Sequence, residues 1–123
     1  MAEPGIVLVI DDEAEVRQVI VRMLHGVGID VVDAANGQDA VALLDGGLRP
    51  AVIVLDLWMP IMDGWAFRKA QVQAHPGIPI VVLSALDLSH ERLVELRADA
   101  LVGKPFDLEQ LYGAVAKAVS GGS

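Results

Sequence analysis

Three short apolar runs constrain the fold of this chain more than any other feature. They are Ile6–Ile10, Ala51–Leu55 and Ile80–Leu83, and each is continuous and rich in valine or isoleucine. A strand with one solvent-exposed face would alternate between apolar and polar residues. A strand of a parallel sheet is covered on both faces and shows no such alternation. The three runs therefore predict the centre of a parallel β-sheet with helices on both sides.

Two weaker runs predict the edges of the same sheet. Ile29–Ala34 is interrupted by Asp30 and Asp33, and Ala100–Val102 is only three residues long. Polar interruptions and short length are typical of strands that lack a neighbour on one side.

Helical periodicity fills the segments between the runs. One apolar face is predicted for the first helix and another for the last, where Asp107 is placed as the N-cap. The first face consists of Val16, Val19, Ile20, Met23, Leu24 and Val27, and the last of Leu108, Leu111, Tyr112, Val115 and Val119. Less distinct helices are expected over residues 38–44, 65–73 and 89–97. Strand and helix thus alternate five times, which predicts an α/β, doubly wound parallel sheet.

Length and composition agree with one domain. The chain has 123 residues, and we assign residues 1–123 to a single domain with its core at about 5–119 and a flexible tail at 120–123. It carries 9 Lys+Arg against 17 Asp+Glu, a net charge of −8, which argues against binding to nucleic acid.

There is no cysteine, and hence no disulfide or thiol chemistry. No apolar run reaches the roughly 18 residues of a membrane span and no signal-peptide pattern opens the sequence, so a cytoplasmic location is expected.

Reactive side chains follow four of the five predicted strands. Asp11 and Asp12 follow the first strand, Asp56 the third and Ser84 the fourth, and Lys104 comes shortly after the fifth. The carboxyl ends of parallel strands meet at one edge of the sheet, where ligands of this fold class bind. We therefore expect these five side chains to lie close together.

The grouping of these residue types indicates a particular chemistry. Three carboxylates repel one another unless a hard divalent cation lies between them, and Mg²⁺ is the natural candidate for oxygen ligands. A hydroxyl and an ammonium group supply donors for phosphoryl oxygens, and a carboxylate can itself form an aspartyl phosphate. The residues predict Mg²⁺-dependent phosphoryl transfer, without indicating which aspartate is attacked.

Longer motifs around these positions resemble the receiver domain of two-component response regulators. The likeness extends over about residues 5–119 and rests on Val9–Glu13, Ala34–Gly37, Asp56–Gly64, Ser84–Ala85 and Lys104–Phe106. It implies a flavodoxin-like sheet of five strands in the order 2-1-3-4-5, as in the chemotaxis member of the family.

The resemblance also assigns roles at the site. Asp56 would be the phosphoacceptor. Asp12 would bind Mg²⁺ directly and Asp11 mainly through water, with Asp56 and the backbone carbonyl of Trp58 as further ligands. Lys104 would pair with Asp56 and later with a phosphoryl oxygen.

The remaining implied roles concern signalling. Ser84 would be the switch hydroxyl that moves toward the phosphoryl group, and a cis peptide bond is expected before Pro105. The phosphoryl donor would be a sensor histidine kinase or a histidine phosphotransfer protein. The domain would then be a phosphorylation-activated switch rather than a turnover enzyme, with no contact to nucleic acid or membrane. The face made by the fourth helix, fifth strand and fifth helix could serve for homodimerisation.

Some positions depart from the family pattern. Leu101 stands where the family usually has Tyr or Phe, so the usual coupling between hydroxyl and aromatic ring is not expected here. Trp58 and Leu86 stand at the two positions that flank the path of the hydrolytic water. Because both are bulky and apolar, the phosphorylated form is expected to be long-lived.

Three other functions compete with the switch. A phosphatase of the haloacid dehalogenase type uses similar groups, but its D-x-D pattern is replaced here by Asp11-Asp12-Glu13. An FMN-binding protein would need a phosphate-binding loop where these two carboxylates stand. A receiver that works only as an interaction module would not need all five of the site residues present here.

Overall fold

The computed structural model describes residues 5–57, 63–85 and 88–121. The strands are β1 (Ile6–Ile10), β2 (Asp30–Ala34), β3 (Val52–Asp56), β4 (Ile80–Ser84) and β5 (Ala100–Gly103). The helices are α1 (Ala14–Gly26), α2 (Gly37–Asp45), α3 (Gly64–Ala74), α4 (His90–Leu96) and α5 (Leu108–Gly121). Trp58 and Leu86 lie outside the described residues, so the predictions made for them stay predictions.

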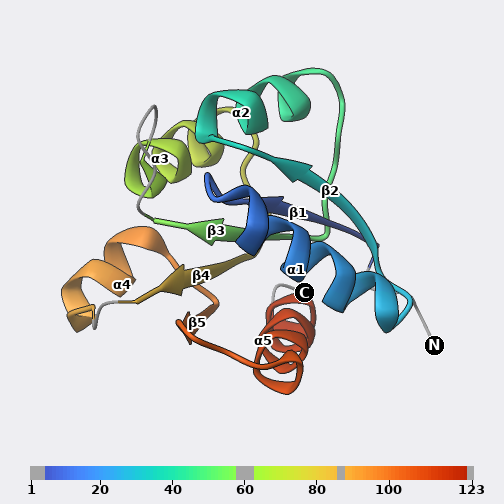
Figure 1. The fold of residues 1–123 in the computed structure, drawn as a ribbon. Helices are drawn as coiled ribbons and strands as arrows, with labels where there is room; N and C mark the ends of the chain where they lie inside the picture. The colour runs from blue at the N-terminus through green and yellow to red at the C-terminus, as the bar shows by residue number, and fades with distance from the viewer. Residues whose placement is uncertain (1–4, 58–62, 86–87, 122–123) are drawn as a thin grey trace.

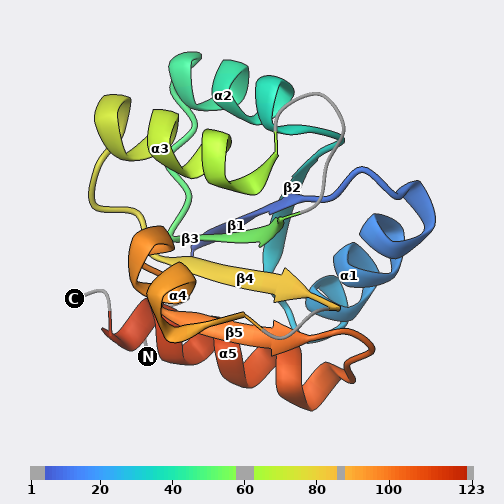
Figure 2. The same ribbon diagram turned by 90° about the vertical axis from the view of Figure 1, so that its left-hand side faces the viewer.

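The five strands form one parallel sheet in the order β2-β1-β3-β4-β5 (Figure 1). This confirms the expected fold class and strand order, with β2 and β5 at the edges. The register sets Ile10 beside Leu55 and Asp56 beside Leu83. All strands therefore end at the same edge of the sheet, called here the carboxyl edge, and Figure 2 shows the arrowheads of β3, β4 and β5 pointing that way.

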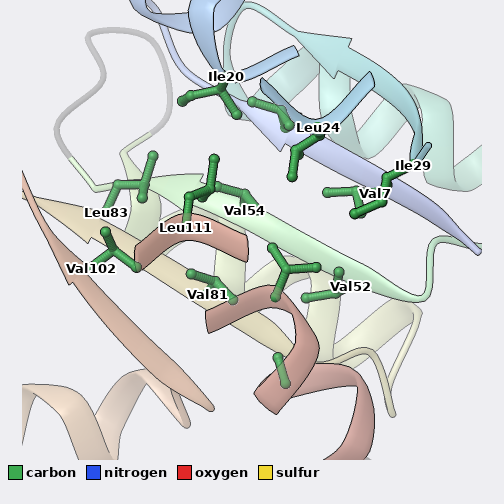
Figure 3. Packing of buried hydrophobic residues seen from close by; sticks show 13 residues of the cluster. Val7, Ile20, Leu24, Ile29, Val52, Val54, Val81, Leu83, Val102 and Leu111 are labelled. Atoms are coloured by element: carbon green, nitrogen blue, oxygen red, sulfur yellow. The ribbon is translucent and has the colours of Figure 1, made fainter. Parts of the chain in front are cut away.

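Helices cover both faces of the sheet. α1 and α5 lie on one face, whereas α2, α3 and α4 lie on the other (Figures 1 and 2). On the first face, Ile20, Leu24 and Leu111 pack onto strand residues such as Val7 and Val54 (Figure 3). Every residue of β3 and β4 is buried, as the absence of alternation predicted.

The buried faces of α1 and α5, the first and last helices, are narrower than the apolar faces that the sequence predicted. Val19 is 41% exposed, Val27 43% and Tyr112 44%, and Leu108 is also exposed. A helix that lies flat on a sheet buries only the stripe that points at the strands, here Ile20 and Leu24 in α1. Four residues of the predicted apolar faces therefore lie outside the buried stripes: Val19, Val27, Leu108 and Tyr112.

The end of the chain follows the predicted pattern with one extension. Asp107 accepts a hydrogen bond from the backbone N–H of Gln110 (2.8 Å) and donates its own N–H to the Gln110 side chain (2.9 Å). This reciprocal pair is a capping box and confirms Asp107 as the N-cap of α5. α5 continues through Gly121, so two residues of the expected tail are helical. Within the described ranges no helix is both long and apolar enough to cross a membrane.

Candidate functional site

The fold brings Asp11, Asp12 and Asp56 together at the carboxyl edge. One carboxylate oxygen from each lies within 4.8 Å of the others, and we call this group the acidic cluster. Asp11 directly follows β1 and is fully buried, and Asp56 ends β3 and is 4% exposed. Asp12 is exposed. The cluster thus has two buried carboxylates and one that faces solvent.

Backbone and side-chain contacts fix Asp11 from several sides. Its N–H donates to the carbonyl of Ala34 (3.2 Å), and its Oδ1 accepts from the N–H of Glu13 (2.9 Å). The Arg17 Nη1 atom donates to the Asp11 carbonyl (2.7 Å), while its Nε donates to Asp33 Oδ2 (2.8 Å). Arg17 is a residue that the sequence analysis missed, since one arginine in an amphipathic helix gives no signal of such a contact.

Lys104 reaches the cluster from the segment after β5. Its Nζ lies 3.4 Å from Asp11 Oδ2 and 3.6 Å from Asp56 Oδ1. Its backbone N–H donates to the carbonyl of Ser84 (2.9 Å), which ties the ends of β4 and β5 together. The peptide bond between Lys104 and Pro105 is cis, as expected. The ammonium group offsets part of the negative charge that the buried carboxylates would otherwise leave uncompensated.

Ser84 is the last residue of β4 and is 2% exposed. It stands at the carboxyl edge one strand away from Asp56, because β3 and β4 are neighbours in the sheet. The five residues that the sequence singled out therefore all lie at the carboxyl edge of the sheet: Asp11, Asp12, Asp56, Ser84 and Lys104. The Trp58 carbonyl, proposed as a further metal ligand, lies outside the described residues.

Gly64, the first residue of α3, lies directly against Leu57, the residue after Asp56. The Gly64 N–H donates to the carbonyl of Leu57 (2.9 Å), and a Cβ at position 64 would lie only 2.7 Å from the Leu57 Cα. Only glycine allows this approach of two backbones. Asp63 then caps α3, since its Oδ1 accepts from the N–H of Ala66 (2.9 Å).

The donor set fits a hard divalent cation. Three carboxylates offer oxygens at a spacing one ion can bridge, and no sulfur or histidine ligand belongs to the cluster. Oxygen-only coordination with few protein ligands is characteristic of Mg²⁺.

Comparison with known proteins identifies the family. The model of the response regulator receiver domain matches residues 7–116. The chain belongs to the response regulator receiver family. It is therefore a receiver domain of a two-component system, and the match supports a phosphorylation-activated switch rather than a phosphatase of the haloacid dehalogenase type.

Curated relatives of this receiver domain are longer regulators. A probable transcriptional regulator ycf27 of Porphyridium aerugineum is 36% identical over 111 residues, which cover 89% of this chain and 45% of the regulator. The DNA-binding transcriptional regulator NtrC of Salmonella typhimurium is 35% identical over 119 residues, 94% of this chain and 25% of NtrC. The chain thus spans less than half the length of either protein.

Solved receiver structures match over their whole length. Chemotaxis protein CheY4 of Vibrio cholerae superposes with a TM-score of 0.84 at 32% identity, covering 95% of this chain and 99% of CheY4. The receiver domain of Francisella response regulator 1452 gives a TM-score of 0.85 at 30% identity, with 97% and 99% covered. The receiver domain is similar to both in fold.

Proposed function

We propose that Asp56 is the phosphoacceptor and that Lys104, Ser84 and the acidic cluster serve its phosphorylation. The observation that carries the proposal is the position of Asp56. Asp56 is 4% exposed and ends the central strand β3, and its Oδ1 lies 3.6 Å from the Lys104 Nζ in a cluster of three carboxylates. Asp11 is equally buried and lies 3.4 Å from the same ammonium group. Asp56 is proposed as the acceptor because it stands at the acceptor's position in the receiver family that the chain matches.

The proposed reaction transfers a phosphoryl group from a phosphohistidine of the donor protein. An Asp56 oxygen forms a bond to phosphorus while the phosphorus–nitrogen bond breaks, and the bonding electron pair returns to the imidazole. Asp11, Asp12, Asp56 and the Trp58 carbonyl would hold Mg²⁺, which when bound would neutralise negative charge on the phosphoryl oxygens. Lys104 moves from its carboxylate partners to a phosphoryl oxygen, and so keeps a charge-assisted contact throughout.

The proposed output begins at Ser84. A phosphoryl oxygen on Asp56 gives the Ser84 hydroxyl a contact that exists in only one of the two states, as a population shift requires. The segment between β4 and α4 would move with it. On this proposal the domain assists its own phosphorylation and dephosphorylation without turning over a separate substrate, and it is not a turnover enzyme.

The proposed partner is a sensor histidine kinase or a histidine phosphotransfer protein, and the proposed location is the cytoplasm. Val94 of α4, Leu101 of β5 and Tyr112 of α5 are exposed, at 60%, 42% and 44%. These apolar side chains support the α4-β5-α5 face as the surface for output or for a homodimer.

Intact mass after incubation with Mg²⁺ and a small acyl phosphate tests the acceptor. We expect one phosphoryl group on the parent chain and none on Asp56→Asn, because an amide oxygen is a far weaker nucleophile. Removal of the metal with a chelator should also prevent labelling, since the carboxylates would then repel the incoming phosphoryl oxygens.

Asp30→Asn is the matched control. Asp30 is exposed and begins β2, at the edge of the sheet opposite the acidic cluster. Its variant should be labelled to the same extent as the parent. Undiminished labelling of Asp56→Asn would mean that another residue is the acceptor.

A further inference from the structure

Two arginine contacts join α4 to α3, one at each end of α4. Both helices lie side by side on the same face of the sheet (Figures 1 and 2). At the N-terminal end, the Arg92 guanidinium lies 5.1 Å from the centre of the Trp65 ring. At the C-terminal end, Arg68 of α3 donates to the carbonyls of Leu96 (2.8 Å) and Arg97 (3.1 Å). We call these the N-terminal contact and the C-terminal contact of α4.

The C-terminal contact is buried and strong. Arg68 is 7% exposed, and beyond the two helix-end carbonyls it donates to the carbonyl of Ile78 (3.0 Å) and to the Gln71 side chain. Burial lowers the pKa of the Arg68 guanidinium, and the Asp99 carboxylate opposes that shift. A cation at the carbonyl end of a helix is favourable, and its removal would leave the buried Leu96 carbonyl and two part-buried carbonyls without their donor.

A second feature holds the same end in place. Arg97, directly after α4, has φ of 53°, a left-handed conformation that is usually taken by glycine. It closes the helix with hydrogen bonds from its own N–H to Val94 (3.0 Å) and from the N–H of Ala98 to Leu93 (3.3 Å). A strained backbone conformation persists only where surrounding contacts hold it in place. Here the hydrogen bond from Arg68 to the Arg97 carbonyl is such a contact.

The N-terminal contact is exposed and weak. Arg92 is exposed, and an exposed cation–π contact changes an equilibrium constant by only roughly two- to fivefold. The first three residues of α4, His90, Glu91 and Arg92, are exposed, whereas Leu96 at the other end is buried. The N-terminal end of α4 can therefore move without uncovering a buried side chain, and the C-terminal end cannot.

We propose that α4 is hinged: its C-terminal contact is a fixed pivot, and its N-terminal contact is a releasable restraint that favours the unphosphorylated arrangement. This inference rests on the proposed function, in which Ser84 moves toward a phosphoryl group on Asp56. Ser89, the N-cap of α4, is only five residues beyond Ser84, so a displacement of Ser84 pulls on the N-terminal end of the helix. Trp65 and Arg92 are positioning residues that act through α4.

Linkage gives a measurable consequence. A restraint that favours the unphosphorylated arrangement must weaken the affinity of the site for a phosphoryl group by the same factor. Arg92→Gln should therefore bind the phosphoryl analogue beryllium fluoride, with Mg²⁺, about two- to fivefold more tightly by calorimetry. Arg22→Gln is the matched control, because Arg22 is an exposed arginine of α1. Arg92→Lys, which keeps a cation over the ring, should fall between the parent and Arg92→Gln.

Tryptophan emission reports the contact directly. The chain has two tryptophans, so in a Trp58→Phe background Trp65 is the single emitter. We expect its emission to change when the analogue binds to that protein, and to be already shifted toward the bound value when Arg92→Gln is added. In the unmodified chain, amide exchange should change in the first turn of α4 and stay unchanged at Leu96–Ala98.

The outcomes separate the two proposals. If an acyl phosphate labels Asp56 but Trp65 emission is insensitive to the analogue, and Arg92→Gln binds no tighter than Arg22→Gln, the hinge is wrong and the proposed function stands. Equal changes in exchange at both ends of α4 would also overturn the pivot. If no variant is labelled, the proposed function fails and the hinge fails with it.

Discussion

At the residue scale, the site combines three carboxylates with a single ammonium group. Lys104 pairs with the two buried carboxylates, Asp11 and Asp56, while Asp12 faces solvent. Each of the three carboxylates is close enough to repel the others. Without a cation these carboxylates repel one another and destabilise the fold. The features that would favour binding of a cation therefore lower the stability of the metal-free protein.

Asp12→Ala tests that opposition. In metal-free buffer the variant should gain about 1 kcal/mol in free energy of unfolding, since two unit charges 4 Å apart repel by roughly that amount in a water-like dielectric. In excess Mg²⁺ the order should reverse, because the parent binds the ion more tightly and so gains more stability from it.

Urea unfolding with and without Mg²⁺ measures both effects. Asp30→Asn serves as the control for loss of one carboxylate away from the cluster. A variant that is less stable than the parent in both buffers would show that Asp12 contributes to the fold rather than repels its neighbours.

At the scale of elements, α4 is the most unusual part of the receiver domain. It is seven residues long, too short to be stable alone, and depends on its contacts with α3 and the sheet. Its end is also strained, because Arg97 takes a left-handed conformation without being glycine. The stability of this element is therefore set by a few identifiable residues.

Arg97→Gly should stabilise the protein by about 0.5–1 kcal/mol, since glycine adopts this conformation without the clash of a Cβ. Arg97→Ala is the matched control: it removes the same charge but keeps a Cβ, and should give no such gain. Thermal and urea unfolding measure the difference. Equal stabilisation by both variants would assign the effect to charge repulsion with Arg68 instead of to the backbone.

β5 is expected to respond little to phosphorylation. Leu101 is 42% exposed and has neither a hydroxyl nor a ring to relocate. Amide exchange on the phosphorylated protein should therefore change after Ser84 and at the start of α4, and little in β5. Leu101→Phe restores a ring and should extend the change into β5. Large changes at Leu101 with no change at 84–89 would contradict this prediction.

At the scale of the whole molecule, acidic charge dominates. The net charge is −8, and the acidic cluster adds a local concentration of carboxylates to that general excess. Self-repulsion of this kind destabilises a compact state and is screened by salt.

Raising the salt concentration from about 0.01 M to about 0.15 M in metal-free buffer should raise Tm by roughly 3 °C, because the screening length falls from about 30 to 8 Å. With Mg²⁺ present the increase should be smaller. Scanning calorimetry measures both. A Tm that falls with salt would show that ion pairs such as Arg17–Asp33 outweigh the repulsion.

The sequence predicted the sheet better than the helix surfaces. Continuous apolar runs identified β1, β3 and β4 because burial on both faces leaves a local pattern, and strand ends placed Asp56 and Ser84 on one edge. The order of the strands came from family resemblance, since local patterns carry no information on neighbours.

What escaped prediction depends on distant contacts. Arg68 looks like a solvent-facing helix residue, yet it is buried by carbonyls 28 and 29 residues further along the chain. The exposure of Tyr112 depends on how α5 lies on the sheet, whereas helical periodicity gives the direction of an apolar face but not its width.

The ion pair between Lys104 and Asp11 joins residues 93 positions apart, one directly after β1 and the other directly after β5. A chain emerging from the ribosome therefore carries Asp11 and Asp56 long before it carries the lysine that pairs with both. Contacts between such distant segments form late, and parallel sheets are slow to assemble. Competence to accept phosphate is consequently a property of the finished fold. A nascent or partly folded copy therefore offers a kinase no complete acceptor site. Only fully folded chains can be phosphorylated and take part in signalling.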